Sequence, residues 1–232
     1  MKVAVVGYRK NYFENAIKKE KSLELTNYKP DTVIAFGGEG TFLYSEIIYP
    51  GIPKVLVLHS SKCNDCKNHG YGKIIKALVN NKFKVAEFLK VQASVKGKTL
   101  VGLNEVNIHY NPPCAIRFSV KVNKKLLAKE CIGDGLIVST PYGSSGYFYS
   151  ITGKTFKNGL GLAFNNPVKP AKSKVVPKNS VIKVKIDRGP GVLCADCNKN
   201  VMPLKTGDVV KIQKHSNFAR ILQLNGKTKV KI

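Results

Sequence analysis

The feature that most constrains the fold of this chain is a change in its hydrophobic rhythm near residue 90. Before that point, short β-branched runs at residues 2–8, 31–41 and 54–59 alternate with segments whose apolar residues recur at helical spacing. The predicted helices cover residues 11–26, 42–48 and 72–81. Because strands that alternate with helices build open parallel sheets, the first part of the chain is predicted to be a Rossmann-like α/β domain.

After about Val91 the chain consists of short segments in which polar and apolar residues alternate, separated by Gly, Asn and Pro. These segments lie at residues 90–110, 115–130, 135–141, 180–186 and 208–215. The pattern is typical of a mostly antiparallel β-sandwich. We place the boundary between residues 88 and 96, which gives an α/β domain over residues 1–92 and a β-sandwich domain over residues 93–217.

The charge of the chain is strongly positive. Its 232 residues include 39 Lys and Arg against 14 Asp and Glu, a formal net charge of +25, and only four of the basic residues are arginines. A field of this sign attracts nucleotides, polyphosphate and nucleic acids such as RNA. The shortage of arginine argues against reading of a base sequence, because lysine lacks the planar fork that pairs with guanine. A solvated lysine surface with no polyanionic partner is the alternative.

No apolar run approaches the roughly 18 residues that are needed to span a bilayer. The N-terminal apolar run is too short for a signal peptide and is followed by no cleavage-like site. The sequence therefore predicts a cytoplasmic protein without a membrane anchor.

Four of the six cysteines form two C-x-x-C pairs, Cys63 with Cys66 and Cys194 with Cys197. Two such pairs are a common ligand set for a structural Zn²⁺ ion, and the same spacing occurs in redox-active dithiols. A stable disulfide is less expected in the cytosol. His59 and His69 flank the first pair and are alternative ligands, whereas His109 and His215 lie in strand-like surroundings and are expected to be structural.

Residues 35–43 (AFGGEGTFL) run from a predicted strand through three glycines into a predicted helix. Such a turn leaves backbone N–H groups accessible to phosphate groups at the positive end of the helix. It matches neither the P-loop nor the dinucleotide fingerprint, and a tight turn without a ligand is the alternative. Glu39 places a carboxylate there that could bind Mg²⁺ or orient an attacking hydroxyl.

Two further stretches carry polar groups at strand ends. Asn104 and Glu105 lie in a strand-like run, and Asp134 precedes the apolar stretch of residues 135–139. A burst of Ser, Gly and Tyr over residues 139–147 then ends that strand. Carboxylates and hydroxyls in such places can hydrogen-bond the edges of a sugar or a base, and a tyrosine can stack on a base.

Taken together and in this order, GGEGT at residues 37–41, NE at residues 104–105 and DGLIVSTPYGSSGY at residues 134–147 resemble the NAD kinase family. The resemblance extends through residues 191–222. It implies transfer of a phosphoryl group from ATP or polyphosphate to the 2′-hydroxyl of the adenosine ribose of NAD, with Mg²⁺. It also implies a homodimer or homotetramer, and a chain end over residues 218–232 that returns to the first domain.

Carried over residue by residue, the resemblance assigns a role to each motif. The phosphate groups would be held by Gly37, Gly38, Gly40 and Thr41, and Glu39 would stand where the family has its catalytic aspartate. The NAD pocket would be lined by Asn104, Glu105, Asp134, Ser144, Ser145, Tyr147 and Asp196. The two C-x-x-C pairs replace segments expected near each other in this fold, which favours one zinc site made of Cys63, Cys66, Cys194 and Cys197.

The departures from the family pattern leave alternatives open. Glu39 is one methylene longer than aspartate, and a misplacement of about 1 Å can cost on the order of a hundredfold in rate. Tyr142 occupies a position that is usually small. One alternative function is therefore a kinase of the same fold that acts on another 2′-hydroxyl, such as that of RNA. The other is a non-catalytic protein that binds nucleotides or RNA.

Overall fold

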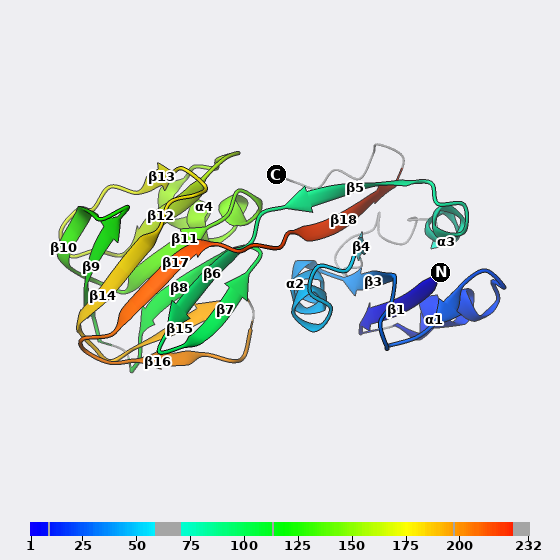
Figure 1. Cartoon of the computed structure of the whole chain (residues 1–232), viewed down its shortest axis with the longest axis horizontal. Helices are drawn as coiled ribbons and strands as arrows, with labels where there is room; N and C mark the ends of the chain where they lie inside the picture. The colour runs from blue at the N-terminus through cyan, green and yellow to red at the C-terminus, as the bar shows by residue number, and fades with distance from the viewer. Residues whose placement is uncertain (9, 59–70, 113, 197, 225–232) are drawn as a thin grey trace. The chain divides into compact units, whose positions relative to one another are not determined.

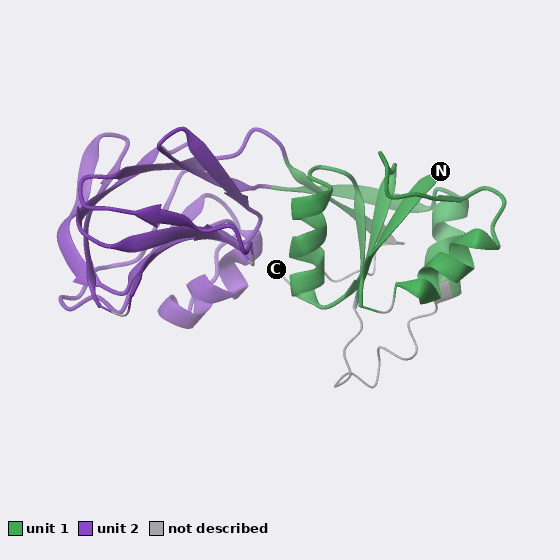
Figure 2. Cartoon of the chain, turned by 90° about the horizontal axis from the view of Figure 1, so that it is seen from below, with its two compact units in different colours: residues 1–88, 218–231 green, residues 89–217, 232 purple. Residues whose placement is uncertain are grey.

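The structure is a computed structural model, and it describes the chain except for residues 9, 59–70, 113, 197 and 225–232. Its described residues divide into two compact units (Figure 2). Unit 1 consists of residues 1–88 together with the returning C-terminal segment from residue 218, and unit 2 consists of residues 89–217. Figure 1 shows helices mainly in unit 1 and strands throughout unit 2. The predicted combination of an α/β domain with a β-sandwich is confirmed.

Unit 1 is a six-stranded sheet in the order β2-β1-β3-β4-β18-β5. All neighbouring strands are parallel except β5, which pairs antiparallel with β18. The strands are β1 (Lys2–Gly7), β2 (Glu24–Leu25), β3 (Thr32–Gly37), β4 (Lys54–Leu58), β5 (Phe83–Phe88) and β18 (Ala219–Leu224). Because β18 comes from the last part of the described chain, the predicted return to the first domain is confirmed for residues 219–224, whereas residues 225–232 of that prediction lie outside the described residues.

Helices cover both faces of this sheet (Figure 2). They are α1 (Asn11–Lys18), α2 (Glu39–Ile48) and α3 (Tyr71–Val79). Phe13 of α1 and Leu78 of α3 share one hydrophobic cluster with alternate residues of the strands, such as Val5 and Ile34. The intervening strand residues, such as Ala35, are also fully buried, and α2 packs against β3 and β1. Burial on both faces explains why these strands read as continuous apolar runs.

The first predicted helix is shorter than its apolar spacing indicated. We expected residues 11–26, but α1 ends at Lys18. Leu23 instead packs into the core, and Glu24 and Leu25 form the edge strand β2 beside β1. Tertiary pairing therefore overrides the local helical spacing at this point.

Unit 2 is built from two six-stranded antiparallel sheets. One has the order β10-β9-β14-β17-β6-β7, and the other has the order β13-β12-β11-β8-β15-β16. The strands of the first sheet are β6 (Val91–Val95), β7 (Lys98–Gly102), β9 (Ile116–Val122), β10 (Lys125–Gly133), β14 (Ile182–Arg188) and β17 (Val209–Lys214). Those of the second are β8 (Glu105–Tyr110), β11 (Gly135–Ser139), β12 (Leu160–Asn165), β13 (Lys174–Val176), β15 (Gly191–Ala195) and β16 (Met202–Leu204).

A single apolar cluster fills the space between the two sheets of unit 2, with fully buried residues such as Phe118 and Ile108. The alternating pattern of the strands places one face of each sheet in this core. We placed the domain boundary between residues 88 and 96, and the division after residue 92 falls inside β6. Because β6 pairs with β7 and β17, unit 2 already begins at Leu89.

Two short helical segments follow β11 in unit 2. They are the 3₁₀ turn η2 (Tyr142–Ser145) and the helix α4 (Tyr147–Thr152), which packs against β11 and β12. In the described part of the chain, no helix has the length and apolar character needed to cross a membrane.

Candidate functional site

A glycine-rich loop joins β3 to α2 in unit 1. At Gly37 φ is +156°, and an added Cβ would lie 2.4 Å from Thr41 Oγ1, so only glycine fits there without strain. Gly38 is the N-cap of α2, and because glycine has no side chain, it provides no side-chain cap for the helix N-terminus. Gly38 and Gly40 are exposed, and a Cβ at either would meet no heavy atom within 4 Å. The loop therefore offers open backbone at the positive end of the α2 dipole, where phosphate groups bind well.

Glu39 is the first residue of α2, and its side chain is exposed beside this open backbone. Thr41 is half-buried, and its hydroxyl lies against Gly37. A carboxylate oxygen is the type of ligand that Mg²⁺ takes in proteins. The structure thus places all five residues predicted for the phosphate site on one loop and the first turn of one helix.

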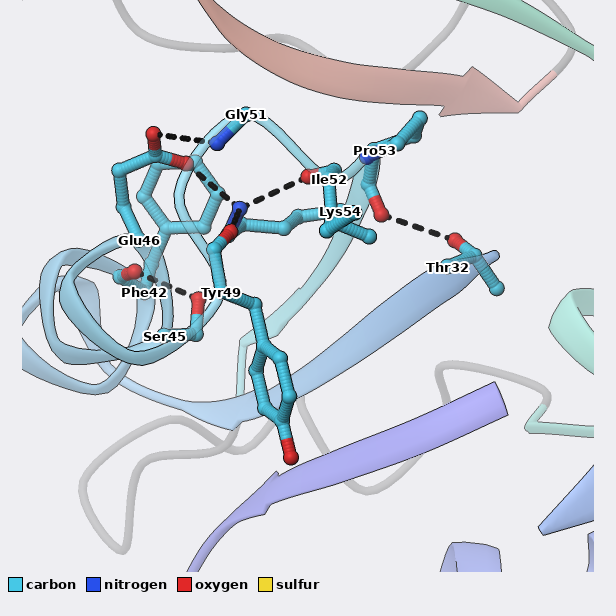
Figure 3. A network of polar contacts seen from close by, with 9 residues as sticks. All are labelled: Thr32, Phe42, Ser45, Glu46, Tyr49, Gly51, Ile52, Pro53 and Lys54. Carbon is cyan, nitrogen blue, oxygen red and sulfur yellow. Dashed lines mark hydrogen bonds and ion pairs between the residues drawn. The ribbon is translucent and has the colours of Figure 1, made fainter. Parts of the chain in front are cut away.

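The far end of α2 is held by a buried ion pair, shown in Figure 3. Lys54 is fully buried, and its Nζ lies 2.5 Å from Glu46 Oε2. The same Nζ donates to the carbonyl oxygens of Tyr49 and Ile52, both at 2.7 Å. The other carboxylate oxygen of Glu46 accepts a hydrogen bond from the N–H of Gly51 at 3.0 Å. This network ties α2 to the start of β4, and so braces the helix that carries Glu39.

The second group of predicted residues lies in unit 2, at the start of β8 and in the segments that flank β8, β11 and β15. Along β8, Val106 and Ile108 enter the core, whereas Glu105, Asn107 and His109 occupy the alternate positions. Asn107 pairs in register with Cys194 of β15. Cys194 also lies outside the core, because its neighbours Leu193 and Ala195 are the residues of β15 that enter it. The strand period therefore gathers polar side chains on one face of an otherwise apolar sheet.

Asp196 organises the turn that leads into β8. It has φ +46°, and its carboxylate accepts hydrogen bonds from the N–H groups of Leu103 at 2.7 Å, Asn104 at 2.8 Å and Glu105 at 3.1 Å. The N–H of Asp196 donates in return to the carbonyl oxygen of Glu105 at 3.1 Å. The described contacts of Asp196 thus fix the Asn104–Glu105 turn, a role that the sequence did not reveal.

The end of β11 is fastened to the same turn. Thr140 donates from its hydroxyl to the carbonyl oxygen of Leu103 at 2.6 Å, and its N–H donates to the carbonyl oxygen of Asn104 at 2.8 Å. Gly143 lies so close that an added Cβ would be 2.3 Å from the same Asn104 oxygen. The Ser144 hydroxyl lies 2.8 Å from the carbonyl oxygen of Pro141 and 3.2 Å from that of Phe156, and it can donate to either of them. Ser144 is therefore buried and braces the turn, whereas Ser145, which follows it, is exposed.

Tyr147 stacks on His109 above this polar face. Their ring centroids are 6.0 Å apart with an interplanar angle of 20°. The Tyr147 hydroxyl accepts a hydrogen bond from Asn165 Nδ2 at 2.9 Å, and Asn107 Nδ2 lies 2.6 Å from His109 Nε2. Asp134 directly precedes β11, and its Oδ2 accepts a hydrogen bond from Asn166 Nδ2 at 3.3 Å. The cluster presents an aromatic ring, amides and carboxylates together.

The charged side chains near Tyr147 are carboxylates, although the chain as a whole carries a net positive charge. Burial raises the pKa of the Tyr147 phenol, and the negative charges of Asp134 and Glu105 add to the effect. Burial likewise raises the pKa of the Cys194 thiol, with a further contribution from Glu105. Burial lowers the pKa of His109, against the opposing influence of Asp134. The site therefore suits a ligand rich in hydrogen-bond donors, such as ribose hydroxyls and amino groups.

Asn107, His109 and Asn165 also belong to this cluster and were not among the predicted site residues. His109 was expected to be structural, and its ring stacks on Tyr147, which is consistent with a supporting role. The signal that could have found Asn107 and His109 is their spacing, because they follow Glu105 at two-residue intervals in one strand. Asn165 gives no comparable signal, since it comes from a different strand.

The zinc site cannot be assembled from the described residues. Cys63, Cys66 and Cys197 lie outside them, and only Cys194 of the predicted ligands is described. Its Sγ lies 3.6 Å from the carbonyl oxygen of Asn107. Within the described ranges, no group of three or more His, Cys, Asp or Glu side chains is arranged to hold a metal ion.

Curated relatives of similar sequence are NAD kinases. The NAD kinase of Sulfurisphaera tokodaii is 29% identical over 210 residues, covering 88% of this chain and 78% of the relative. The NAD kinase of Saccharolobus solfataricus is 28% identical over 238 residues, covering 96% of this chain and 94% of the relative. The similarity thus extends over both units.

Solved structures share the fold. An NAD kinase from Archaeoglobus fulgidus in complex with ATP superposes with a TM-score of 0.77 at 21% identity, covering 97% of this chain and 94% of that one. Yeast NADH kinase complexed with NADH superposes with a TM-score of 0.75 at 16% identity, covering 96% of this chain and 83% of that one. The family model described as the ATP-NAD kinase C-terminal domain matches residues 103–224, which include the whole polar cluster of unit 2. The chain belongs to the NAD kinase family.

Proposed function

We propose that this enzyme transfers the terminal phosphoryl group of ATP to the 2′-hydroxyl of the adenosine ribose of NAD, which yields NADP. The observation that carries the proposal is the Asn104–Glu105 turn, held through three backbone N–H groups by Asp196. Relatives of similar sequence over both units are NAD kinases. A turn fixed in this way holds polar side chains in place before a ligand arrives.

In unit 1, the backbone of Gly38 and Gly40 would bind the phosphate groups of ATP, supported by Gly37 and by the Thr41 hydroxyl. The exposure of both glycines and the position of the loop at the start of α2 support this role. An NAD kinase of the same fold has been solved in complex with ATP, which supports ATP as the donor over polyphosphate.

Glu39 would accept the proton of the 2′-hydroxyl as its oxygen attacks the γ-phosphorus of ATP. The bond between that phosphorus and the oxygen of the ADP leaving group breaks in the same step, and ADP and NADP are the products. The Glu39 carboxylate is also the type of oxygen ligand that Mg²⁺ takes beside phosphate groups. When bound, Mg²⁺ neutralises charge on the transferring phosphoryl group.

In unit 2, the donor groups of NAD would be bound by Asn104, Glu105 and Asp134, and an aromatic ring of NAD would stack on Tyr147. The stacking of Tyr147 on His109 holds the phenol ring in place for this contact. Ser145 is exposed and available to a ligand, whereas Ser144 and Asp196 would act by holding the backbone of the site.

The test is formation of NADP by the purified full chain with NAD, ATP and Mg²⁺. Glu39→Gln should abolish most of the turnover, by on the order of a hundredfold or more. Glu24→Gln, an exposed glutamate in β2, is the matched control and should leave turnover unchanged. Absence of turnover in folded protein supplied with NAD or NADH would overturn the proposal.

A homodimer or homotetramer, a cytoplasmic location and a zinc site at the cysteine pairs remain predictions of the sequence and its resemblance. Sedimentation of the purified protein tests the first. Metal analysis tests the last, since less than one zinc ion per four of these cysteines would exclude the site.

A further inference from the structure

The outer face of the β9-β14-β17 region in unit 2 carries a row of lysines. Lys121 of β9 pairs in register with Lys183 of β14, and Lys183 pairs in register with Lys211 of β17. The flanking residues Val120, Val184 and Ile212 are all buried in the sandwich core. Because successive strand residues point to opposite faces, the three lysines lie on one outer face, and all three are exposed.

This arrangement is unfavourable for the isolated protein. Like charges directly opposite on neighbouring strands repel each other and destabilise the sheet. In the described part of the chain, none of these three lysines forms an ion pair. The row continues on one side to Ser94 and Thr99, whose hydroxyls lie 2.8 Å apart and carry no charge.

A fourth lysine shares the face, two residues along β14. The Nζ of Lys185 lies 3.4 Å from Asp187 Oδ1, and Asp187 also accepts a hydrogen bond from the Ser119 hydroxyl. Asp187 is therefore already engaged, away from the row. The row itself is the portion of the face whose positive charge is left for an external anion.

We propose that the row of Lys121, Lys183 and Lys211 is a binding surface for the phosphate backbone of double-stranded nucleic acid. Neighbouring strands lie about 4.8 Å apart, so the row spans about 10 Å. A duplex carries one phosphate per strand for about every 3.4 Å of helix axis, so a length of about 10 Å holds several phosphate groups within reach of the three lysine side chains. Lysine neutralises phosphates without reading bases. The row and its continuation to Thr99 contain no aromatic side chain on which unpaired bases could stack, which favours a duplex over a single strand.

The surface is distinct from the residues proposed for NAD, none of which lies in β9, β14 or β17. The proposed binding at the row therefore uses none of the residues proposed for the kinase activity. Loss of one function in a variant need not accompany loss of the other, and the two can be measured separately.

The test compares two triple variants with the same change in net charge. In the first, Lys121, Lys183 and Lys211 are all replaced by Gln. In the control, Lys21, Lys76 and Lys178 are replaced by Gln, because these exposed lysines lie on three separate segments. Binding of a short labelled DNA duplex of arbitrary sequence is followed by fluorescence anisotropy over a series of salt concentrations.

The first variant should bind more weakly, and its plot of log affinity against log salt should be less steep by about 2.7, or about 0.9 for each lost phosphate contact. The control should change the slope by less than half as much. Removing the repulsion should also raise the Tm of the first variant relative to the control at low salt. Equal weakening in both variants would overturn the proposal, as would wild-type protein that binds inorganic polyphosphate but not the duplex.

Discussion

The carboxylate of Asp196 accepts a hydrogen bond from the backbone N–H of Asn104 at 2.8 Å, and the N–H groups on either side of Asn104 donate to the same carboxylate. Three donors converge on one ionised acceptor, and hydrogen bonds to charged groups are stronger than neutral ones. This single side chain therefore determines the path of the backbone into β8, on which much of the proposed NAD site depends.

Replacement of Asp196 by Ala should leave these N–H groups without their acceptor. A loss of about 2–3 kcal/mol in the free energy of unfolding is expected, because unsatisfied donors that are partly buried are costly. Urea denaturation measures the loss. Asp196→Asn keeps one acceptor oxygen, so its free energy of unfolding should lie between those of Asp196→Ala and wild type. An Asn variant no more stable than the Ala variant would contradict this account.

The fold was largely predictable because its two kinds of hydrophobic period are local properties of the chain. Residues 37–41 were predictable for the same reason, since a strand, glycines and a helix follow one another directly. The inward hydroxyl of Ser144 and the backbone role of Asp196 were not predictable. Both depend on partners from distant segments, Phe156 and Leu103 among them, and no local pattern reports such contacts.

Lys54 and Glu46 give a second prediction, on stability. Replacing Lys54 by Met leaves the buried Glu46 carboxylate without the ammonium group that lies 2.5 Å away. The expected loss is about 3–5 kcal/mol, the usual cost of breaking a buried ion pair from one side. The double variant Lys54→Met with Glu46→Leu should recover a large part of this loss, because no buried charge remains. Urea denaturation of wild type, the two single variants and the double variant measures the coupling free energy between Lys54 and Glu46. Losses of stability that simply add in the double variant would contradict the prediction.

Gly143 and Gly146 form a matched pair for testing the Asn104 turn. A Cβ at Gly143 would lie 2.3 Å from the carbonyl oxygen of Asn104, whereas at Gly146 the nearest atom is 3.4 Å away. Gly143→Ala should therefore displace Asn104 and raise the KM for NAD, on the order of tenfold or more given the sensitivity of such sites to small displacements. Gly146→Ala should have a small effect. Steady-state kinetics with equal effects in the two variants would argue against the turn as part of the NAD site.

Gly40→Ala separates binding of phosphate groups from stability. The residue lies in the first turn of α2, and an added Cβ meets no atom of the protein within 4 Å. Alanine favours a helix over glycine by up to about 1 kcal/mol, so the variant should be at least as stable as wild type in thermal unfolding. If phosphates approach this backbone closely, the same variant should have a raised KM for ATP and an unchanged KM for NAD. A variant with unaltered kinetics for ATP would place the phosphates elsewhere.

His109 should make stability depend on pH. Burial lowers its pKa below the ordinary histidine value of 6.5, so the folded protein binds this proton less readily than the unfolded chain. The stabilisation by neutral His109 is therefore present above about pH 6.5 and is lost as the pH falls through the lowered pKa of the folded state. Protonation would also prevent Nε2 from accepting the hydrogen bond of Asn107 Nδ2.

The measurement is urea denaturation of wild-type protein and of His109→Gln at a series of pH values from neutral to mildly acidic. Glutamine is polar and does not titrate, so the difference in stability between the two proteins should shrink as the pH falls. His215→Gln is the control, because His215 lies on the segment after β17 and its ring contacts only the backbone of Asn217 among the described hydrogen bonds. A difference between wild type and His109→Gln that stays constant with pH would show that the His109 imidazole is not held neutral by its burial against Tyr147.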